Sequence, residues 1–323
     1  MATQKLKIAL IGAGHLGKIH LKCIQQIPEF EFVGIYDILE SARALAVSEF
    51  GIKAFDSYEE IIEQCDAVDI VTSTSSHYTL AAYAISKGKH CFIEKPVTNS
   101  LEEATELRKL LDANPVKIQI GHVERFNPSF AAIRPYIKEP KFIEAHRLSS
   151  FNPRGRDVSV IHDVMIHDLD LICLLAKSPV KDIKANGVSL VSPLPDICNA
   201  RIEFENGLVC NVTASRISMK QMRKLRIFQE DAYISIDMLE KEAQVIRLLD
   251  DYQDNTLEIE THKGNKYISL VNPEIKSVNA ILEELKSFYK CIVNDELPEV
   301  NLDEGIQALA LVQAITKQIE ENQ

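Results

Sequence analysis

A short apolar run at residues 7–11 leads directly into the glycine pattern GAGHLG at residues 12–17, and apolar side chains then recur at helical spacing up to Pro28. A strand, a glycine-rich turn and a helix in this order restrict the segment to the start of a βαβ unit in a parallel sheet. The first glycine permits the tight turn, the second lets the backbone approach a pyrophosphate, and the third lets helix and strand pack closely. The motif therefore predicts a dinucleotide site at the N-terminus of the helix.

An acidic residue at the end of the next apolar run supports this interpretation. Asp37 lies about 20 residues after the last glycine, where such a domain carries the carboxylate that binds the ribose hydroxyls. A carboxylate there repels a 2′-phosphate, and neither Ile38 nor Leu39 supplies a cation to neutralise one. We therefore expect NAD rather than NADP, with Arg43 as a nearby residue able to soften the preference. The predicted cofactor contacts in this segment are Gly12, Gly14, His15, Leu16, Gly17 and Asp37.

The first third of the chain alternates short apolar runs with amphipathic segments. We expect strands at residues 7–11, 32–36, 67–71, 90–93 and 116–121, and helices at 16–27, 41–50, 78–87 and 100–113. Buried strands that alternate with helices are typical of a parallel sheet covered on both faces. Residues 1–122 are therefore predicted to form an NAD-binding Rossmann domain, an α/β fold with a doubly wound parallel sheet.

Beyond residue 122 the pattern becomes mostly strand after strand. Strands are expected at residues 183–190, 200–205, 208–215, 224–229, 233–237, 244–249 and 257–261, and helices at 127–137, 159–176, 278–293 and 303–320. Residues 123–323 are therefore predicted to be an α+β substrate and oligomerisation domain with a large open antiparallel sheet, whose final helix packs back on the first domain. Because the second face of such a sheet needs a cover, we expect a homodimer or homotetramer.

Composition narrows the possible partners. A formal net charge of −11 disfavours nucleic acid and anionic membranes, and the basic stretch at residues 216–226 is expected to be a solvated or interface edge. The sequence has no apolar run of the length that a membrane span needs and no signal-peptide pattern. None of the seven cysteines lies in a C-x-x-C pair, which favours free thiols in a reducing cytoplasm.

A lysine stands at the end of one predicted strand, in the segment CFIEKP. Lys95 lies at the carboxyl end of a strand in a parallel sheet, where such sheets place ligands, and Pro96 cannot continue the ladder. From the residues alone, Lys95 is either a functional group or an exposed lysine that closes a strand.

A second group lies on the predicted helix at residues 159–176. Asp163 and His167 are four residues apart, so a helix places them on one face, where a carboxylate can orient an imidazole and raise its basicity. The offsets of His162, Asp168 and Asp170 point elsewhere. A hydrogen-bonded structural histidine is an alternative. A metal site is another, but the usual further ligands are not obvious, so no metal is expected.

Together, the glycine motif, the segment TSTSSHYTLAAYAISKGKHCFIEKP and the segment HDVMIHDLDL resemble the Gfo/Idh/MocA family of oxidoreductases. The resemblance implies a Rossmann domain followed by a domain with a large open antiparallel sheet, and NAD(P)-dependent oxidation of CH–OH groups in sugars or polyols. It also implies that Lys95, Asp163 and His167 are catalytic and that the Lys95–Pro96 bond is cis. Further implied cofactor contacts are Thr74, His77, Glu94 and Lys95.

The segments GHVERFNPSF and FNPRGRDVSVIHDVMIHDLDL look like those of the family's bacterial UDP-N-acetylglucosamine 3-dehydrogenases and related nucleotide-sugar enzymes. In that case Arg154 and Arg156 could hold a diphosphate, because paired guanidinium groups suit phosphate oxygens; the alternative is that they are surface charges of a loop. The full set of implied substrate residues is Lys95, Arg125, Asn127, Arg154, Arg156, Asp163 and His167.

Two other functions stay open on the sequence. One is a dehydrogenase of a free polyol, inositol or aldose, since the sequence indicates hydride chemistry more clearly than the substrate. The other is a dinucleotide-binding regulator without catalytic activity, which the retention of Lys95, Asp163 and His167 disfavours.

Overall fold

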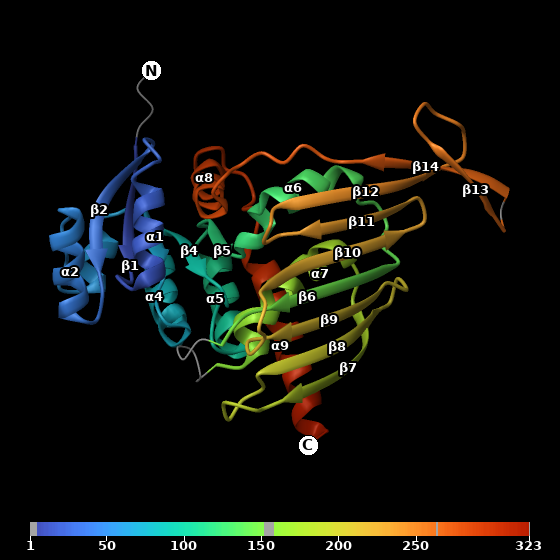
Figure 1. The fold of residues 1–323 in the computed structure, drawn as a ribbon. Helices are drawn as coiled ribbons and strands as arrows, with labels where there is room; N and C mark the ends of the chain where they lie inside the picture. The colour runs from blue at the N-terminus through green and yellow to red at the C-terminus, as the bar shows by residue number, and fades with distance from the viewer. Residues whose placement is uncertain (1–4, 152–157, 263, 323) are drawn as a thin grey trace. The chain divides into compact units, whose positions relative to one another are not determined.

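The computed structural model describes residues 5–151, 158–262 and 264–322 of the chain. These residues form two compact units, which Figure 1 shows in ribbon form. The first unit runs to Val123 and also contains Asn279–Leu309, and the second contains Glu124–Val278 and the residues from Ala310 on. Each unit is built around its own β-sheet.

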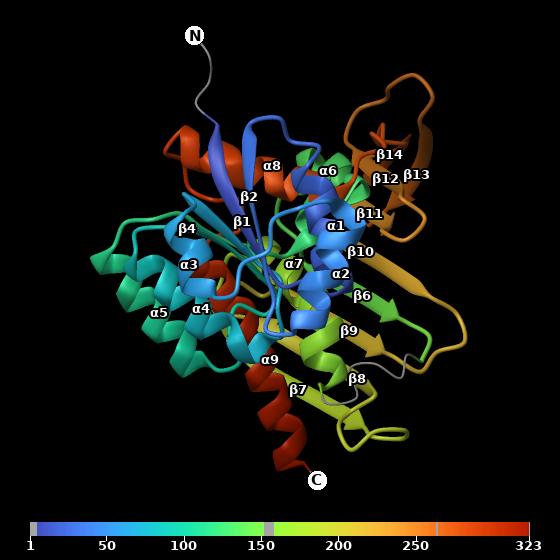
Figure 2. The same cartoon turned by 90° about the vertical axis from the view of Figure 1, so that its left-hand side faces the viewer.

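The first unit has a parallel five-stranded sheet of order β2-β1-β3-β4-β5, so the predicted Rossmann fold is confirmed. Helices α4 and α5 pack together on one side of this sheet, while α1 contacts α8 (Figure 2). The strand order reverses direction between β1 and β3, and open sheets of this type bind ligands outside that point. The strands are β1 (Leu6–Ile11), β2 (Phe30–Tyr36), β3 (Ala67–Ile70), β4 (His90–Glu94) and β5 (Ile118–Gly121). The helices are α1 (His15–Ile24), α2 (Glu40–Phe50), α3 (Tyr58–Glu63), α4 (Thr74–Ser86), α5 (Leu101–Ala113) and α8 (Ala280–Val293).

Two of these helices end or begin where local sequence signals predict. Gly51 follows α2 in the left-handed conformation with a φ of 64°, which favours glycine. Ser100 caps α5 by accepting a hydrogen bond from the Glu103 N–H at 3.3 Å. The Glu103 carboxylate accepts from the Asn99 N–H at 3.0 Å, one residue before the donor that a capping box uses.

Helix α8 belongs to the first unit, although the sequence-based division assigned it to the second domain. Its apolar face, including Leu285 and Phe288, packs in one buried cluster with Ile8 of β1, Ile24 of α1 and Phe92 of β4. This burial explains the placement, because an amphipathic helix is stabilised mainly by covering its apolar face. The first part of α9 (Leu302–Glu321) also lies in the first unit and the rest in the second.

The second unit contains a nine-stranded sheet of order β13-β14-β12-β11-β10-β6-β9-β8-β7 (Figure 1). It is mostly antiparallel as predicted, but β6 pairs with β9 in parallel. The sequence analysis did not predict β6, β14 or the short helix α3; for β6 the reason is that both of its partners, β9 and β10, lie far along the chain. The strands are β6 (Phe142–Leu148), β7 (Val180–Val188), β8 (Ile197–Phe204), β9 (Val209–Ser215), β10 (Met222–Gln229), β11 (Ala232–Asp237), β12 (Glu242–Leu249), β13 (Leu257–Thr261) and β14 (Gly264–Val271).

The two faces of this sheet differ in polarity. Alternate residues such as Ile143, Val212 and Ile227 are buried on the face that carries α6 (Pro128–Ile133) and α7 (Ile166–Ala176). The intervening residues include the ion pair Arg226–Glu144. The second face therefore carries charged residues as well as apolar ones, and the oligomer stays a prediction.

Two further predictions concern membranes and thiols. In the part of the chain that the structure describes, every helix is too short or too polar to cross a lipid bilayer. All seven cysteines are free thiols, as predicted. Burial raises the pKa of the Cys65 thiol to about 12, so this group stays protonated at neutral pH.

Candidate active site

A cavity of about 660 Å³ opens at the carboxyl ends of β1, β2 and β3 in the first unit. Of the predicted cofactor contacts, Gly12, Gly14, His15, Leu16 and Asp37 line it. The sequence analysis missed Tyr36 and Tyr58, which also line the cavity and whose ring centres lie 6.2 Å apart. The position of Tyr36, directly before Asp37 at the end of β2, is the signal that could have indicated the first of them.

The three motif glycines have the separate roles that the spacing predicts. Gly12 has a φ of 110°, and a Cβ there would lie 2.3 Å from the Val71 carbonyl oxygen, so the turn requires glycine. A Cβ on Gly17 would lie 2.0 Å from the Gly12 carbonyl oxygen, which reflects the close packing of α1 on β1. A Cβ on Gly14 would meet no atom within 4 Å. The space above Gly14 is therefore open for a ligand to approach the backbone.

Asp37 is held rigidly at the end of β2. Its Oδ2 accepts a hydrogen bond from the Ala13 N–H at 2.7 Å, and its Oδ1 accepts one from the Leu39 N–H at 2.9 Å. Arg43 donates from Nη1 to the Asp37 carbonyl oxygen at 2.7 Å, and its guanidinium lies 5.9 Å from the ring centre of Tyr36. The Asp37 carboxylate is thus fixed in the cavity wall by a hydrogen bond from the glycine loop.

Two predicted cofactor contacts, Thr74 and His77, do not line the cavity. His77 is buried, and its Nδ1 lies 2.9 Å from the Pro96 carbonyl oxygen while its Nε2 lies 3.2 Å from that of Thr72. Burial lowers the pKa of His77, although the carbonyl contacts oppose the shift, so the ring is neutral near pH 7. His77 therefore joins the cavity loop at Thr72 to the segment after Lys95 as a structural link.

Lys95 follows the last residue of β4 and is half-buried. The Lys95–Pro96 peptide bond is cis, as the family resemblance implies. The Lys95 N–H donates to the Glu94 Oε2 at 3.1 Å, so the carboxylate of one residue fixes the backbone of the next. Glu94 was predicted to contact the cofactor, but it does not line the cavity, and its carboxylate faces the buried side chain of His20.

In the second unit, Asp163 and His167 lie at a change of helix type. Asp163 belongs to a π-helical turn, Ile161–Met165, and His167 belongs to α7, which begins at Ile166. The regular α-helix expected from residue 159 is therefore interrupted, and π-helical turns occur frequently at functional sites. Asp163 is exposed and His167 is half-buried, so both side chains reach the surface of this unit.

Asp168 and Asp170, whose offsets were predicted to point away from Asp163 and His167, are buried in the core. Asp168 accepts from the Arg147 Nε at 3.0 Å and from its Nη2 at 2.7 Å, and the same guanidinium donates from Nη1 to Glu124 at 2.7 Å. Asp170 accepts from the Arg125 Nη2 at 2.7 Å. These buried ion pairs attach α7 to β6 and to the segment that follows β5.

Arg125 and Asn127, which were predicted to bind substrate, are both buried. The Arg125 side chain is 1% exposed and its guanidinium pairs with Asp170. Asn127 is buried, caps α6 by accepting from the Ser129 N–H at 3.1 Å, and donates to the Met238 carbonyl oxygen at 3.1 Å. Both side chains use their polar groups within the second unit, which leaves little surface for a ligand.

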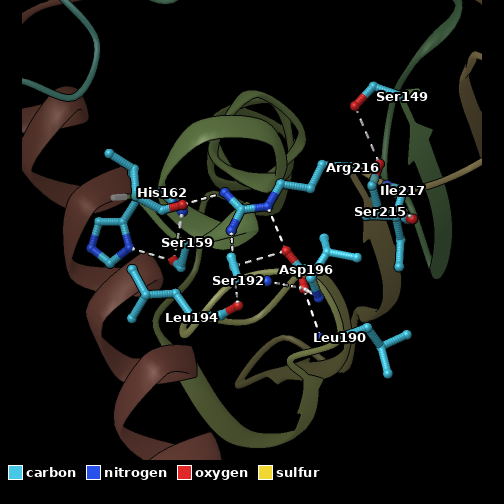
Figure 3. Close-up of polar contacts among 12 residues, drawn as sticks. Ser149, Ser159, His162, Leu190, Ser192, Leu194, Asp196, Ser215, Arg216 and Ile217 are labelled. Carbon is cyan, nitrogen blue, oxygen red and sulfur yellow. Dashed lines mark hydrogen bonds and ion pairs between the residues drawn. The ribbon is translucent and has the colours of Figure 1, made fainter. Parts of the chain in front are cut away.

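Arg216 anchors the start of the segment that carries Asp163 and His167 (Figure 3). It donates from Nε to Asp196 at 2.9 Å, from Nη2 to the Ser192 hydroxyl at 2.6 Å, and from Nη1 to the Val158 carbonyl oxygen. Arg216 is buried and pairs with Asp196, so the prediction of a solvated or interface edge at residues 216–226 is wrong at this position. Arg154 and Arg156, predicted to bind a diphosphate, lie outside the described residues, shortly before this anchor point.

The Asp196 carboxylate is the centre of this anchor. It accepts hydrogen bonds at 2.7 Å from the N–H groups of Leu190 and Val191, in addition to that from Arg216. Burial would raise the pKa of Asp196, but these hydrogen bonds outweigh it and hold the pKa well below its usual range. The ion pair is therefore intact throughout the neutral range.

Comparisons with known proteins identify relatives for both units. Residues 6–122 match the "Oxidoreductase family, NAD-binding Rossmann fold" model of Gfo/Idh/MocA proteins, and residues 107–235 match the GFO/IDH/MocA C-terminal domain. The UDP-N-acetylglucosamine 3-dehydrogenase of Acidithiobacillus ferrooxidans is 37% identical over 72% of this chain and 74% of its own. The scyllo-inositol 2-dehydrogenase (NAD(+)) of Bacillus subtilis is 26% identical over 94% of this chain and 93% of its own. A solved structure of the Acidithiobacillus ferrooxidans enzyme matches with a TM-score of 0.89 at 30% identity, covering 98% of each chain.

Proposed function

Because the chain belongs to the Gfo/Idh/MocA oxidoreductase family, we propose that it transfers a hydride between a hydroxyl carbon of a nucleotide sugar and NAD. The observation that carries the proposal is a dinucleotide cavity with an open Gly14 and a rigid Asp37, in a chain that also retains Lys95, Asp163 and His167. Similarity to a UDP-N-acetylglucosamine 3-dehydrogenase supports a nucleotide sugar over a free sugar.

Each catalytic group has a role that its chemistry suits. NAD, when bound, supplies the hydride acceptor. His167 takes the proton of the hydroxyl that is oxidised, and Asp163 orients the imidazole for that step. Lys95 hydrogen-bonds the same oxygen or relays its proton. In this proposal Arg154 and Arg156 hold the diphosphate of the substrate.

A substrate screen tests the proposal. Purified protein is mixed with NAD or NADP and with UDP-sugars, the corresponding free sugars, inositols or simple aldoses, and NAD(P)H formation is followed by absorbance. We expect reduction of NAD with a UDP-sugar and little or none with the matching free sugar. Turnover of inositol alone would favour the second candidate, a polyol dehydrogenase, which the similarity to an inositol dehydrogenase also supports. Binding of NAD without reduction by any compound would favour a regulator.

We further propose that NAD is preferred to NADP because Asp37 would face the 2′ position. The variant Asp37→Ser/Ile38→Arg replaces the repelling carboxylate with a cation, and Ile38 is exposed and lines the cavity, so the arginine has room. We expect the ratio of kcat/KM for NAD to that for NADP to fall by about a hundredfold, which corresponds to the loss of roughly 2.7 kcal/mol of discrimination. An unchanged ratio would contradict the role of Asp37. The variant Asp56→Ser is the control, since Asp56 is an exposed partner of Arg43 outside the cavity lining.

We also propose that the protein is a cytoplasmic homo-oligomer. Seven thiols without a disulfide support a reducing compartment. The open face of the second sheet carries an aromatic row, Phe142, Phe228 and Tyr233, with ring centres 5.8 and 4.9 Å apart, which suits contact with a second copy. A stable monomer in light scattering would contradict this part of the proposal.

A further inference from the structure

A cluster of ionisable side chains is buried in the first unit, next to Lys95 in the chain. His20 of α1 lies between two carboxylates, with its Nδ1 2.9 Å from the Asp69 Oδ2 and its Nε2 3.2 Å from the Glu94 Oε1. Glu284 of α8 completes the cluster, since an oxygen of its carboxylate lies within 4.8 Å of ligand atoms of both His20 and Glu94. All four residues are buried. None of the roles assigned above involves His20, Asp69 or Glu284.

Glu284 is the unusual member of the cluster. It is 0% exposed, and neither of its carboxylate oxygens has a hydrogen-bond partner among the described residues. The groups around it are Glu94, His20 and Asp69, with the Cys23 thiol nearby on α1. An ionised carboxylate in this position would lack both water and a partner, which is strongly unfavourable. Glu284 therefore needs a proton or a cation.

The geometry of His20 favours protons over a cation. Its Nδ1 forms a hydrogen bond with the Asp69 carboxylate, and its Nε2 lies 3.2 Å from the Glu94 Oε1 without forming a hydrogen bond, so the positive charge of an imidazolium placed between two carboxylates offsets theirs. With His20 charged, Asp69 and Glu94 ionised and Glu284 neutral, the cluster carries one negative charge. An ammonium group at Lys95 then brings the sum to zero, without any bound ion.

The surroundings hold the cluster in place and exclude water. The Phe92 ring lies edge-on to His20 at 5.7 Å between ring centres, and the Phe288 ring packs against Phe92 at 5.9 Å. A Cβ on Gly121 would lie 2.7 Å from the Glu94 Oε1, so the absence of a side chain at Gly121 makes room for that carboxylate beside β5. Glu94 in turn accepts the hydrogen bond from the Lys95 N–H.

We propose that Glu284 is a buried, protonated carboxylic acid which, with the imidazolium of His20, forms a proton-holding cluster that keeps Glu94 ionised beside Lys95. His20 and Glu284 are thus positioning residues for the reaction and do not contact the substrate. The chemical consequence is a fixed negative charge at Glu94 that orients Lys95 and balances its ammonium group.

The directions of the pKa shifts of Glu284, His20 and Glu94 agree with this arrangement, whereas burial raises the pKa of Asp69 against the opposing contact with His20. Burial raises the pKa of Glu284 well above its usual value, and the neighbouring Glu94 charge raises it further. For His20, burial lowers the pKa, but Asp69 and Glu94 outweigh that effect and raise it well above 6.5. For Glu94, burial raises the pKa, but the contact with His20 and the charge of Lys95 lower it overall.

The test uses the pH dependence of stability, which does not require a known substrate. A raised pKa in the folded protein means that stability falls as pH rises from the unfolded pKa toward the folded pKa. The glutamine side chain of the variant Glu284→Gln is neutral at every pH, so this variant does not lose stability in this way. We expect the unfolding midpoint of Glu284→Gln to rise relative to that of the wild type as pH increases above about 4.3. The difference in the free energy of unfolding between the two proteins should grow with pH at the slope expected for one proton per molecule. Glu283→Gln, the matched control, changes the adjacent partly exposed residue that pairs with Lys286, and we expect no such rise.

Two results of this experiment would overturn the proposal. A stability difference between Glu284→Gln and the wild type that stays flat with pH would mean that Glu284 is ionised in the folded protein. A divalent metal bound at one per chain in the purified wild type and lost in Glu284→Gln would identify the cluster as a cation site instead.

A second measurement tests the positioning role and rests on the proposed dehydrogenase function. His20→Gln removes the buried positive charge and leaves excess negative charge beside Lys95. We expect the rising limb of kcat/KM for sugar oxidation to move to higher pH by about one unit. A uniform loss of kcat/KM at every pH would indicate only a structural role for His20. If no sugar is oxidised, the proposed function fails while the stability test still decides the protonation of Glu284.

Discussion

Replacing Lys95 with alanine is expected to lower kcat for sugar oxidation by about a hundredfold or more, because general acid–base groups typically contribute factors of 10² to 10⁴. Binding of NAD should stay close to that of the wild type. The glycine turn and Asp37 line the dinucleotide cavity, and Lys95 does not. The measurement is steady-state kinetics together with a direct titration of NAD.

The control for this variant is Lys109→Ala, which removes an exposed lysine of α5 and should leave kcat unchanged. A comparison with His167→Ala sharpens the test. If Lys95 and His167 act on the same hydroxyl, the double variant should lose much less than the product of the two single losses, because groups that act as a unit are non-additive. Near-normal turnover in Lys95→Ala would remove Lys95 from the catalytic set.

The second large effect concerns stability. Arg125→Leu is expected to lower the free energy of unfolding of the second unit by about 3–5 kcal/mol, because it leaves the Asp170 carboxylate buried without its cation. Asp170 is 0% exposed and its oxygens accept from Arg125 at 2.7–3.2 Å. Chemical denaturation followed by circular dichroism measures the loss.

An exposed pair of the same chemistry provides the control. Arg226 is 44% exposed and pairs with Glu144 at 2.9 Å, so Arg226→Leu should change stability by no more than about 1 kcal/mol. The double variant Arg125→Leu/Asp170→Leu should recover most of the loss, because it removes the uncompensated charge. Equal effects of Arg125→Leu and Arg226→Leu would contradict the structural role of Arg125.

The fold of the first unit was largely predictable because its signals are local. Each strand of the parallel sheet is a short apolar run, and glycine or a polar cap marks many of the helix ends. Most strand pairs in the second unit join neighbours in the chain, but β6 pairs with β9 and β10, which lie far from it in sequence. The strand Phe142–Leu148 lies in parallel beside Val209–Ser215, and no local pattern specifies that neighbour.

Some features of the candidate site were likewise predictable from the sequence, and others were not. Backbone requirements at Gly12 and Gly17 are visible in the sequence because only glycine meets them. The spacing of Asp163 and His167 was also visible, but the π-helical turn at Asp163 was not. The sequence could not tell that Arg125 is buried, because an arginine beside a motif looks the same whether it binds a ligand or a buried carboxylate.

By itself, the sequence determined the order of the five strands and of helices α1, α2, α4 and α5 in the first unit, the glycine turn with Asp37 at the expected spacing, and the positions of Lys95, Asp163 and His167. Those features depend on residue type and spacing along the chain. Only the tertiary structure decided which charges meet: Glu284, remote in sequence from Glu94, lies beside it, and Arg216 anchors the segment before Asp163. The reason is physical, since burial and charge pairing depend on distances in space, which sequence separation does not determine.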